Sequence, residues 1–478
     1  MATKNKVENN RKLIIIGIDG GTFDIINPLI AKNKLPNLSS FKNKAILKST
    51  IPPGTGVAWA SFSTGNFPGK TNIYDFTIVD DNSWKIKIVN RSLLNSKPLW
   101  KYLDESGIKG FFINIPITYP PEKINGVMIS GIDAPSTFSN YVHPTELKEK
   151  LKEFGYEIEV SGIKEKKSLP DQALSIIDKR IITANYLLKK EFDFFIMLFR
   201  ETDVAQHFAW GTNKVEKAYT KIDKFIGEVK NLAEKNKWDL IVMSDHGHER
   251  VTKAFNVNSW LEKEGYLKTF VKKQSFLSLI GINRERIFKV LDNLKLNFLV
   301  KIVPRKLGKK IPTENIDFEE AILTGLIDLT KTRAVGKRAV KTAQIFLNSE
   351  SRGGIVKNID EDRLKNEIKI KLHEFLKSNN IEAEVKTKEE LYGGKTMYAP
   401  DITVYMKEKG YDIQTKFSSD GKIWGEPKEL ATHEVNGIIL TDMDLNLKSP
   451  RIVDLTPTIL DYFNIKKGDF DGKSLLWG

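Results

Sequence analysis

Short, almost uninterrupted apolar runs recur along the chain and alternate with segments of helical periodicity. The runs predict buried β-strands at residues 13–18, 45–50, 110–116, 126–131, 192–199, 239–244 and 436–441. Before the strand at 239, apolar side chains at helical spacing predict an amphipathic helix: Val215, Ala218, Tyr219, Ile222, Phe225 and Val229. Residues 454–463 predict a capped helix. Strands and helices that alternate in this way predict βαβ units around a mostly parallel sheet, and so an α/β fold.

The alternation is interrupted between about residues 255 and 425. This interval holds a long helix-like tract at 276–303 and strand-like runs at 343–347 and 402–406. We therefore expect a discontinuous α/β core, made of residues 11–254 and 426–478, with residues 255–425 inserted as a cap region.

Composition places the chain among soluble globular proteins, because 40% of its 478 residues are hydrophobic and 28% are charged. The first residues are polar, and neither a signal peptide nor an apolar window of about 18 residues is recognisable. We therefore expect a cytoplasmic protein. The chain has no cysteine, which excludes disulfides, thiolate metal ligands and cysteine nucleophiles.

The formal net charge of +14 is concentrated in one segment. Residues 268–310 hold twelve Lys or Arg side chains against two acidic ones, a net charge of +10. A packed helical cap with a solvated charged face would explain this segment. The alternative is peripheral contact with an anionic membrane, or binding of a lipid-linked phosphate substrate. Nucleic acid is not an expected partner, because no reader motif accompanies the charge.

Acidic residues follow three of the predicted strands. Asp19 comes after the strand at 13–18, Asp203 after that at 192–199, and Asp245 after that at 239–244. Ligands of open α/β sheets bind beyond the carboxyl ends of the strands. We therefore expect these three carboxylates to lie close together at one edge of the sheet.

Histidines accompany these acids, although the chain has only six. His207 follows Asp203 by four residues, His246 is adjacent to Asp245, and His433 precedes the last predicted strand. With Asp19, these side chains offer ligands for two divalent ions. A mixed Asp and His set suits Zn²⁺ first and Mn²⁺ second, rather than Mg²⁺.

Two neighbours of His246 have different expected roles. Gly247 is expected to allow a sharp turn after the strand. For His248 three roles stay open: support of the metal site, contact with the substrate, or an exposed position in the turn.

A nucleophile candidate lies in the segment PPGTGVAWASFSTGNFPGK, residues 52–70. Thr55 begins a helical pattern there, so its hydroxyl lies at a helix N-terminus, where backbone N–H groups favour phosphate. A divalent ion bound to this oxygen would lower its pKa and activate it for attack on phosphorus. Thr55 could instead serve only as the N-cap of the helix.

In order along the chain, the motifs GIDGG, PPGTGVAWASFSTGNFPGK, ETDVAQHFAW, MSDHG, APDITV and ATHEVNGIIL resemble the type I phosphodiesterase/nucleotide pyrophosphatase branch of the alkaline phosphatase superfamily. The chain is most similar to intracellular members described as predicted phosphohydrolases or phosphomutases. The resemblance implies a three-layer α/β sandwich and two metal ions. One ion would be held by Asp203, His207 and His433. The other would be held by Asp19, Asp245, His246 and the nucleophile Thr55, which becomes a phosphothreonine.

The chain departs from the pattern of this family at two places. Nucleotide pyrophosphatases have asparagine three residues after the threonine, where this chain has Ala58 followed by Trp59. Closer relatives have His-Gly where Thr71 and Asn72 stand here. Both differences concern contacts to the substrate and leave the implied metal ligands intact.

The expected function is therefore metal-dependent cleavage of a phosphodiester or pyrophosphate through Thr55. The first alternative is a phosphomonoesterase, or a phosphomutase of the cofactor-independent phosphoglycerate mutase kind, although that class uses serine as its nucleophile. The second is a membrane-docked binding protein without activity, which would require the metal sites to be empty or inert.

Overall fold

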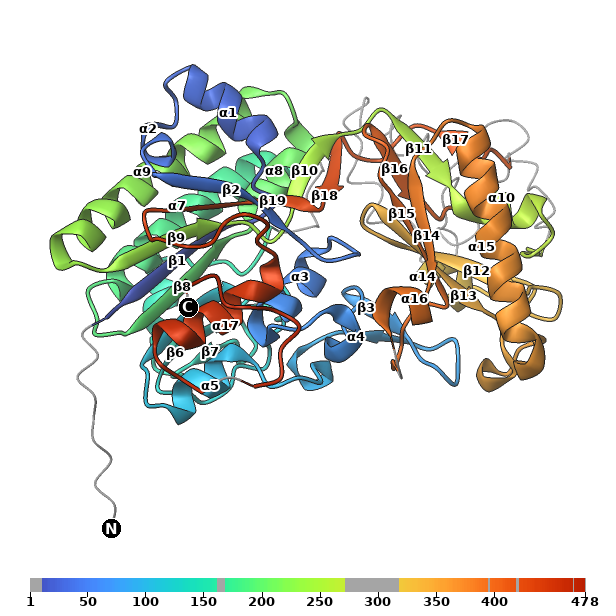
Figure 1. Cartoon of the computed structure of the whole chain (residues 1–478), viewed down its shortest axis with the longest axis horizontal. Coiled ribbons are helices and arrows are strands. Elements are labelled where there is room, and N and C mark those ends of the chain that lie inside the picture. The colour runs from blue at the N-terminus through green and yellow to red at the C-terminus, as the bar shows by residue number, and fades with distance from the viewer. Residues whose placement is uncertain are drawn as a thin grey trace, which may run out of the picture.

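The computed structural model describes residues 11–160, 168–270, 318–393, 396–417, 421–466 and 468–477. Its largest sheet has eight strands in the order β2-β19-β9-β1-β8-β5-β6-β7 (Figure 1). In chain order these are β1 (Leu13–Ile18), β2 (Asn43–Lys48), β5 (Gly110–Ile115), β6 (Gly126–Ser130), β7 (Val142–His143), β8 (Phe194–Phe199), β9 (Asp239–Met243) and β19 (Asn436–Thr441). The five strands from β9 to β6 are parallel, whereas β19 and β7 are antiparallel to their neighbours.

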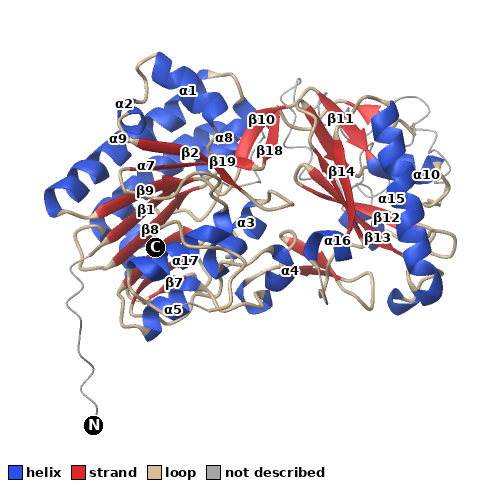
Figure 2. Ribbon diagram, viewed as in Figure 1, coloured by secondary structure: helices blue, strands red, loops and turns tan. Residues whose placement is uncertain are grey.

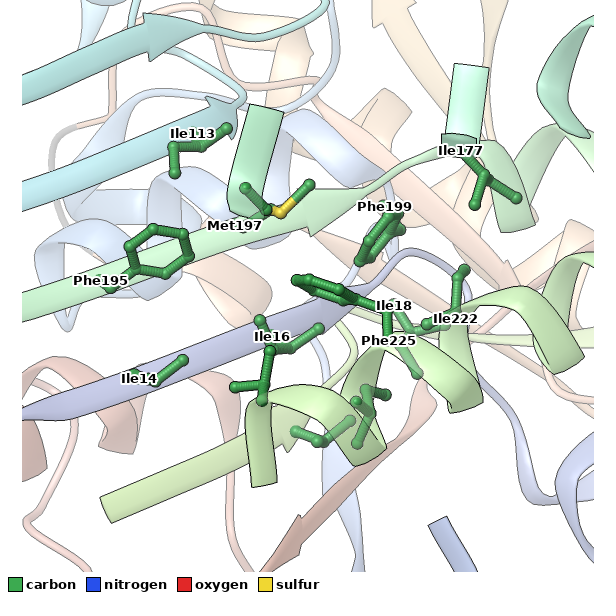
Figure 3. Packing of buried hydrophobic residues seen from close by; sticks show 14 of the residues in the cluster. Ile14, Ile16, Ile18, Ile113, Ile177, Phe195, Met197, Phe199, Ile222 and Phe225 are labelled. Atoms are coloured by element: carbon green, nitrogen blue, oxygen red, sulfur yellow. The ribbon is translucent and has the colours of Figure 1, made fainter. Parts of the chain in front are cut away.

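Helices cover both faces of this sheet. Successive residues of β1 point to opposite faces, so the strand contributes apolar side chains to both layers of helices. Ile14, Ile16 and Ile18 pack against α1, α7 and α9 (Figure 3), whereas Leu13 and Ile15 pack against α3, α5 and α17. The helices of this core lobe are α1 (Phe23–Ala31), α2 (Pro36–Ser39), α3 (Thr55–Thr64), α4 (Pro68–Thr71), α5 (Leu99–Glu105), α6 (Leu147–Glu153), α7 (Leu169–Leu187), α8 (Glu201–Ala209), α9 (Asn213–Asn236) and α17 (Leu455–Tyr462). The predicted three-layer α/β sandwich with a mostly parallel sheet is confirmed.

A second lobe is formed by the elements from β11 to β17 (Figure 2). Its main sheet is antiparallel, in the order β12-β13-β15-β14, and α15 packs on one face of it. A smaller sheet joins β16, β11 and β17. The elements are β11 (Lys253–Asn256), α10 (Val257–Lys263), α14 (Phe318–Leu323), β12 (Ala334–Ala339), β13 (Thr342–Leu347), α15 (Glu361–Ser378), β14 (Ala383–Thr387), α16 (Lys388–Tyr392), β15 (Ile402–Met406), β16 (Tyr411–Gln414) and β17 (Trp424–Gly425). A hairpin of β3 (Thr77–Val79) and β4 (Ile86–Ile88) lies beside this lobe.

The other face of the antiparallel sheet is polar and buried against the core lobe. Lys337 of β12 pairs with Asp75, and the side chain of Gln344 in β13 donates to the Tyr74 carbonyl at 2.8 Å. Lys337 and Gln344 are direct neighbours across the two strands. The contact between the two lobes is therefore polar, while the apolar face of the sheet lies under α15.

A two-stranded ribbon, β10 (Gly247–Arg250) with β18 (Ala431–Glu434), joins the two lobes. His248 and His433 are directly opposite each other, so their side chains leave the same face of the ribbon. The neighbouring residues Glu249 and Glu434 leave the other face. There Glu249 pairs with Lys341, and the Tyr405 hydroxyl donates to Glu434 at 3.5 Å.

Most of the predicted strands and helices are confirmed within two residues, but three details are wrong. The strand expected to be buried at 45–50 is β2, an edge strand in which only Leu47 is buried. Asp454 does not cap α17 with its side chain, because its carboxylate accepts hydrogen bonds from Arg451 and from the Lys473 amide. Gly247 does not form a turn of positive φ; it begins β10, where an added Cβ would lie 2.2 Å from the Asn436 carbonyl oxygen.

Other expectations stay open. The helix-like tract at 276–303 and most of the basic segment at 268–310 lie outside the described residues. The four-stranded sheet of the second lobe falls within 255–425, and β11 begins two residues before that range. We keep 255–425 as a proposed inserted unit between the core segments 11–254 and 426–478. Across the described part of the chain, no helix is both long and apolar enough to span a bilayer.

Candidate active site

Thr55 is the first residue of α3, a helix with a buried N-terminus. Gly54 is the N-cap, and the first helical hydrogen bond runs from the Ala58 amide to the Gly54 carbonyl at 2.8 Å. The amides of Thr55, Gly56 and Val57 precede that bond, so they are available to a ligand. The interpretation of Thr55 as only an N-cap is therefore wrong, and its hydroxyl lies beside three amides that can bind phosphate oxygens.

One cluster surrounds the Thr55 hydroxyl at the carboxyl ends of β1 and β9. The hydroxyl oxygen lies 3.3 Å from Asp19 Oδ1 and 3.1 Å from His246 Nε2. The same His246 nitrogen is 3.2 Å from Asp19 Oδ1 and 3.4 Å from Asp245 Oδ2. All four side chains are buried.

A second cluster surrounds Asp203 at the start of α8. Asp203 Oδ1 is 3.2 Å from His207 Nε2, 3.0 Å from His433 Nε2 and 3.4 Å from His248 Nε2. The helix places Asp203 and His207 one turn apart on the same face, and β10 and β18 supply the other two imidazoles. The rings of His246 and His433 stack, with centroids 3.7 Å apart, so the two clusters adjoin each other.

The three predicted histidine ligands share one orientation. Each Nδ1 lies at hydrogen-bond distance from a carbonyl oxygen: His207 from Ala431 (2.9 Å), His433 from Pro53 (2.7 Å) and His246 from Gly247 (3.0 Å). If Nδ1–H donates to the carbonyl, the lone pair of Nε2 points into the cluster, as it does in histidines that bind metals. His207 Nε2 and His433 Nε2 are only 3.0 Å apart. Two lone pairs at this distance require a proton or a metal cation between them.

Several ligand atoms of these clusters have no hydrogen-bond partner although they are buried. Among the described residues these are Asp19 Oδ2, Asp203 Oδ1, Asp245 Oδ2 and His248 Nε2. An unpaired buried polar group costs about 1–3 kcal/mol, and more when it is charged. The donor atoms of Asp203, His207, His248 and His433, and those of Asp19, Asp245 and His246, lie within 4.8 Å of one another in each set. A divalent cation in each cluster would satisfy these atoms.

The carboxyls of the Thr55 cluster also indicate missing positive charge. Burial, together with the neighbouring Asp245 carboxylate, raises the pKa of Asp19 well above its ordinary value. Burial raises the pKa of Asp245 to about 8. Without a cation, these raised pKa values favour the protonated forms of the two carboxyls, and Asp245 would hold its proton near neutral pH. A bound divalent ion would let both be ionised.

Charged side chains orient the ligands from outside the clusters. Arg200 Nη1 donates to Asp203 Oδ2 at 2.8 Å, and its Nε pairs with Glu159. This fixes the Asp203 carboxylate so that its other oxygen faces the three imidazoles. Glu429 lies 3.4 Å from His207 Nδ1 and 3.2 Å from Arg338 of the second lobe. A cleft of about 390 Å³ borders His207 and Glu429.

All seven residues expected from the sequence lie in these two clusters: Asp19, Thr55, Asp203, His207, Asp245, His246 and His433. His248 also lies in the Asp203 cluster, a position that the sequence left open. Its i, i+2 spacing from His246 was the available signal, because alternate residues of an extended segment face the same side. His143 and His373 lie elsewhere, in β7 and on the exposed face of α15.

Comparison with known families agrees with this geometry. The family model described as type I phosphodiesterase / nucleotide pyrophosphatase matches residues 13–437. The chain belongs to this family. It is accordingly an enzyme of the phosphoester hydrolase class, and the clusters fall inside the matched range. A search of curated protein sequences gives no significant match.

Solved structures share the fold of this chain. Human ectonucleotide pyrophosphatase / phosphodiesterase 5 is 13% identical over 97% of both chains, with a TM-score of 0.54. The same values hold for an inactive form of the murine protein in complex with AMP. Phosphonoacetate hydrolase from Sinorhizobium meliloti, in complex with phosphonoformate, is 13% identical over 94% of both chains, with a TM-score of 0.56. These likenesses establish the alkaline-phosphatase-like fold.

Proposed function

We propose that this enzyme cleaves phosphodiester or pyrophosphate bonds through a covalent phosphothreonine at Thr55, with two divalent cations. Family membership supports the hydrolase class. The observation that carries the finer proposal is the position of the Thr55 hydroxyl, 3.3 Å from Asp19 and 3.1 Å from His246 at the N-terminus of a helix.

The buried donor set fits two cations of the Zn²⁺ or Mn²⁺ type. Asp203, His207 and His433 would hold one, and Asp19, Asp245, His246 and Thr55 the other. The features that fit are the unpaired carboxylate oxygens and the three imidazoles whose Nδ1 atoms lie at hydrogen-bond distance from carbonyl oxygens. When bound, such ions neutralise phosphate oxygens and favour the ionised form of the Thr55 hydroxyl.

The chain's own groups account for the remaining steps. The Thr55 oxygen forms a bond to phosphorus while the bond to the leaving-group oxygen breaks, and the leaving-group oxygen takes up the proton that the Thr55 hydroxyl loses. The amides at the start of α3 bind the phosphoryl oxygens and orient them. Water then displaces the threonine oxygen, which releases a phosphomonoester and restores the hydroxyl.

The test compares bis-p-nitrophenyl phosphate with p-nitrophenyl phosphate. Protein stripped of metal with a chelator is assayed on both compounds, before and after addition of Zn²⁺ or Mn²⁺. We expect faster cleavage of the diester, restored by metal. We also expect mass spectrometry of acid-quenched enzyme to find the adduct on the peptide that contains Thr55.

Three outcomes would change the proposal. Faster cleavage of the monoester would favour the phosphomonoesterase or phosphomutase alternative. Turnover without an adduct at Thr55, and undiminished in Thr55→Ala, would exclude the threonine nucleophile. No turnover of either compound, with both ions bound, would favour a binding role or a substrate too selective for these probes.

The basic segment at 268–310 supports a further part of the proposal. A net charge of +10 in 43 residues suits an anionic membrane surface or a lipid-linked phosphate substrate, consistent with a cytoplasmic protein that is peripheral to the membrane. Co-sedimentation with vesicles that contain or lack acidic lipid tests this, and binding that is independent of acidic lipid would contradict it.

A further inference from the structure

His248 occupies a position in the Asp203 cluster that the expected ligand set leaves unused. It lies in β10, directly opposite His433 of β18, and is 1% exposed. Its ring centroid is 4.7 Å from that of His207 and 4.8 Å from that of His433. Its Nε2 atom is 3.4 Å from Asp203 Oδ1 and has no hydrogen-bond partner among the described residues.

The residues around His248 fit closely against its imidazole ring. Gly20 packs against it, and a Cβ on Gly20 would lie 2.2 Å from His248 Nδ1. Gly20 also has φ +65°, a conformation that favours glycine. The neighbouring Gln206 amide donates to the Gly20 carbonyl at 3.0 Å and is 3.5 Å from His248 Nδ1, the outer limit of a hydrogen bond.

A purely structural histidine would not explain this arrangement. The other three histidines of the clusters hydrogen-bond a carbonyl oxygen through Nδ1, whereas His248 makes at most one long contact there. Burying an imidazole nitrogen without a partner costs about 1–3 kcal/mol. The donor atoms within reach of its Nε2 are those of a metal-binding set.

We propose that His248 is a fourth protein ligand, through Nε2, of the cation held by Asp203, His207 and His433. This inference rests on the proposed two-cation function. Three imidazoles and one carboxylate form a nitrogen-rich set that suits tetrahedral Zn²⁺ or Co²⁺. The Asp19, Asp245, His246 and Thr55 set is richer in oxygen. The two positions therefore differ in affinity, and the Asp203 position fills first with Zn²⁺ or Co²⁺.

Cobalt titration of the metal-free full-length protein tests this proposal, because the visible Co²⁺ band intensifies as coordination number falls. The variants are His248→Gln and His248→Ala; His373→Ala, at an exposed position of α15, is the matched control. We expect the wild-type protein and the control to bind two ions, the first with an intense band. In the His248 variants we expect that band to shift and weaken, because water molecules replace the lost imidazole and raise the coordination number of the ion above four. The affinity for the first ion should fall by more than about 100-fold, beyond the 10–100-fold typical of losing an outer partner.

Folding is monitored by near-ultraviolet circular dichroism and by thermal unfolding without metal. His248→Gln keeps a polar side chain of similar size, should the alanine variant fail to fold. A folded His248 variant that binds both ions with unchanged affinity and an unchanged band overturns the inference. A loss of affinity below 100-fold with an unchanged band also overturns the inference. That result would make His248 a hydrogen-bond donor to Asp203 and not a metal ligand. If the wild-type protein binds no cobalt, the proposed two-cation function fails as well.

Discussion

The two lobes use buried charge in different ways. In the core lobe and its ribbon, buried carboxylates and imidazoles converge with several donor atoms unpaired. At the contact with the second lobe, buried lysines form ion pairs with carboxylates, as in Lys341 with Glu249 and Lys337 with Asp75. Unpaired charge indicates a place for a ligand, whereas paired charge indicates fixed geometry. We therefore expect the chemistry in the core lobe and its ribbon, while Lys341 and Tyr405 of the second lobe contact the other face of the ribbon.

The largest expected effect concerns the nucleophile. Thr55→Ala should lower kcat by at least about a thousandfold, because the group that bonds to phosphorus is lost while the other ligands stay. Steady-state kinetics on bis-p-nitrophenyl phosphate measure this. Thr55→Ser, which keeps a hydroxyl, should retain measurable activity. If Thr55→Ala lowered kcat only slightly, Thr55 would not be the nucleophile, and the chemistry could no longer be assigned to the core lobe on this ground.

The next effect concerns the ion pair between the lobes. Lys341→Met leaves Glu249 buried without its partner, and we expect the free energy of unfolding to fall by about 3–5 kcal/mol. Urea unfolding followed by circular dichroism measures the change. The double variant Lys341→Met with Glu249→Gln removes both charges and should recover most of the loss. If the free energy of unfolding fell equally in the single and double variants, the two charges would not stabilise the protein as a pair.

Smaller effects are expected when the two arginines that orient the proposed metal ligands are replaced. Arg200 contacts Asp203 directly, whereas Arg338 of the second lobe reaches His207 only through Glu429. We expect Arg200→Gln to weaken Zn²⁺ binding by about 10–100-fold and Arg338→Gln to weaken it less. Isothermal titration calorimetry of the metal-free variants measures both. The reverse order would mean that the second lobe controls metal affinity.

The smallest expected effects test whether the lobes unfold together. Thr22 caps α1 in the core lobe, and Thr387 forms a capping box with Glu390 at α16 in the second lobe. Replacement of either threonine by alanine should cost about 1 kcal/mol. If the paired charges make the lobes cooperative, both variants should shift the same single urea transition. Two separate transitions, each sensitive to one variant, would contradict this.

The core lobe could be predicted from the sequence because its central strands, such as β1, β5 and β8, are buried on both faces. Continuous apolar runs such as Leu13–Ile18 therefore stand out. The β12 segment AVGKRA and the β14 segment AEVKT do not, since charged residues such as Lys337 and Lys386 interrupt the apolar pattern. Lys337 is buried only because Asp75 neutralises it across the lobe contact, a long-range pairing that local periodicity cannot indicate.

The residues of the candidate site also divide into those that the local sequence predicts and those that depend on long-range contacts. Acids at the ends of parallel strands must meet, so the amino-acid sequence alone was enough to group Asp19, Asp203 and Asp245. His248 could not be assigned, because its role depends on its register with His433 across the ribbon. Arg200 was missed for a related reason: in sequence, a charged residue that orients a carboxylate looks like any solvated charge.

The ribbon of β10 and β18 has a consequence for the order in which the protein is made. His207 and His433 are 226 residues apart in the chain, and the second lobe is synthesised between His248 and His433. While the ribosome is still translating the second lobe, the nascent chain lacks the last imidazole and the strand that carries it. The Asp203 centre is therefore incomplete until β18 has been translated and has paired with β10. A chain released before β18 would lack the complete centre, so the activity proposed for that centre would be absent from it.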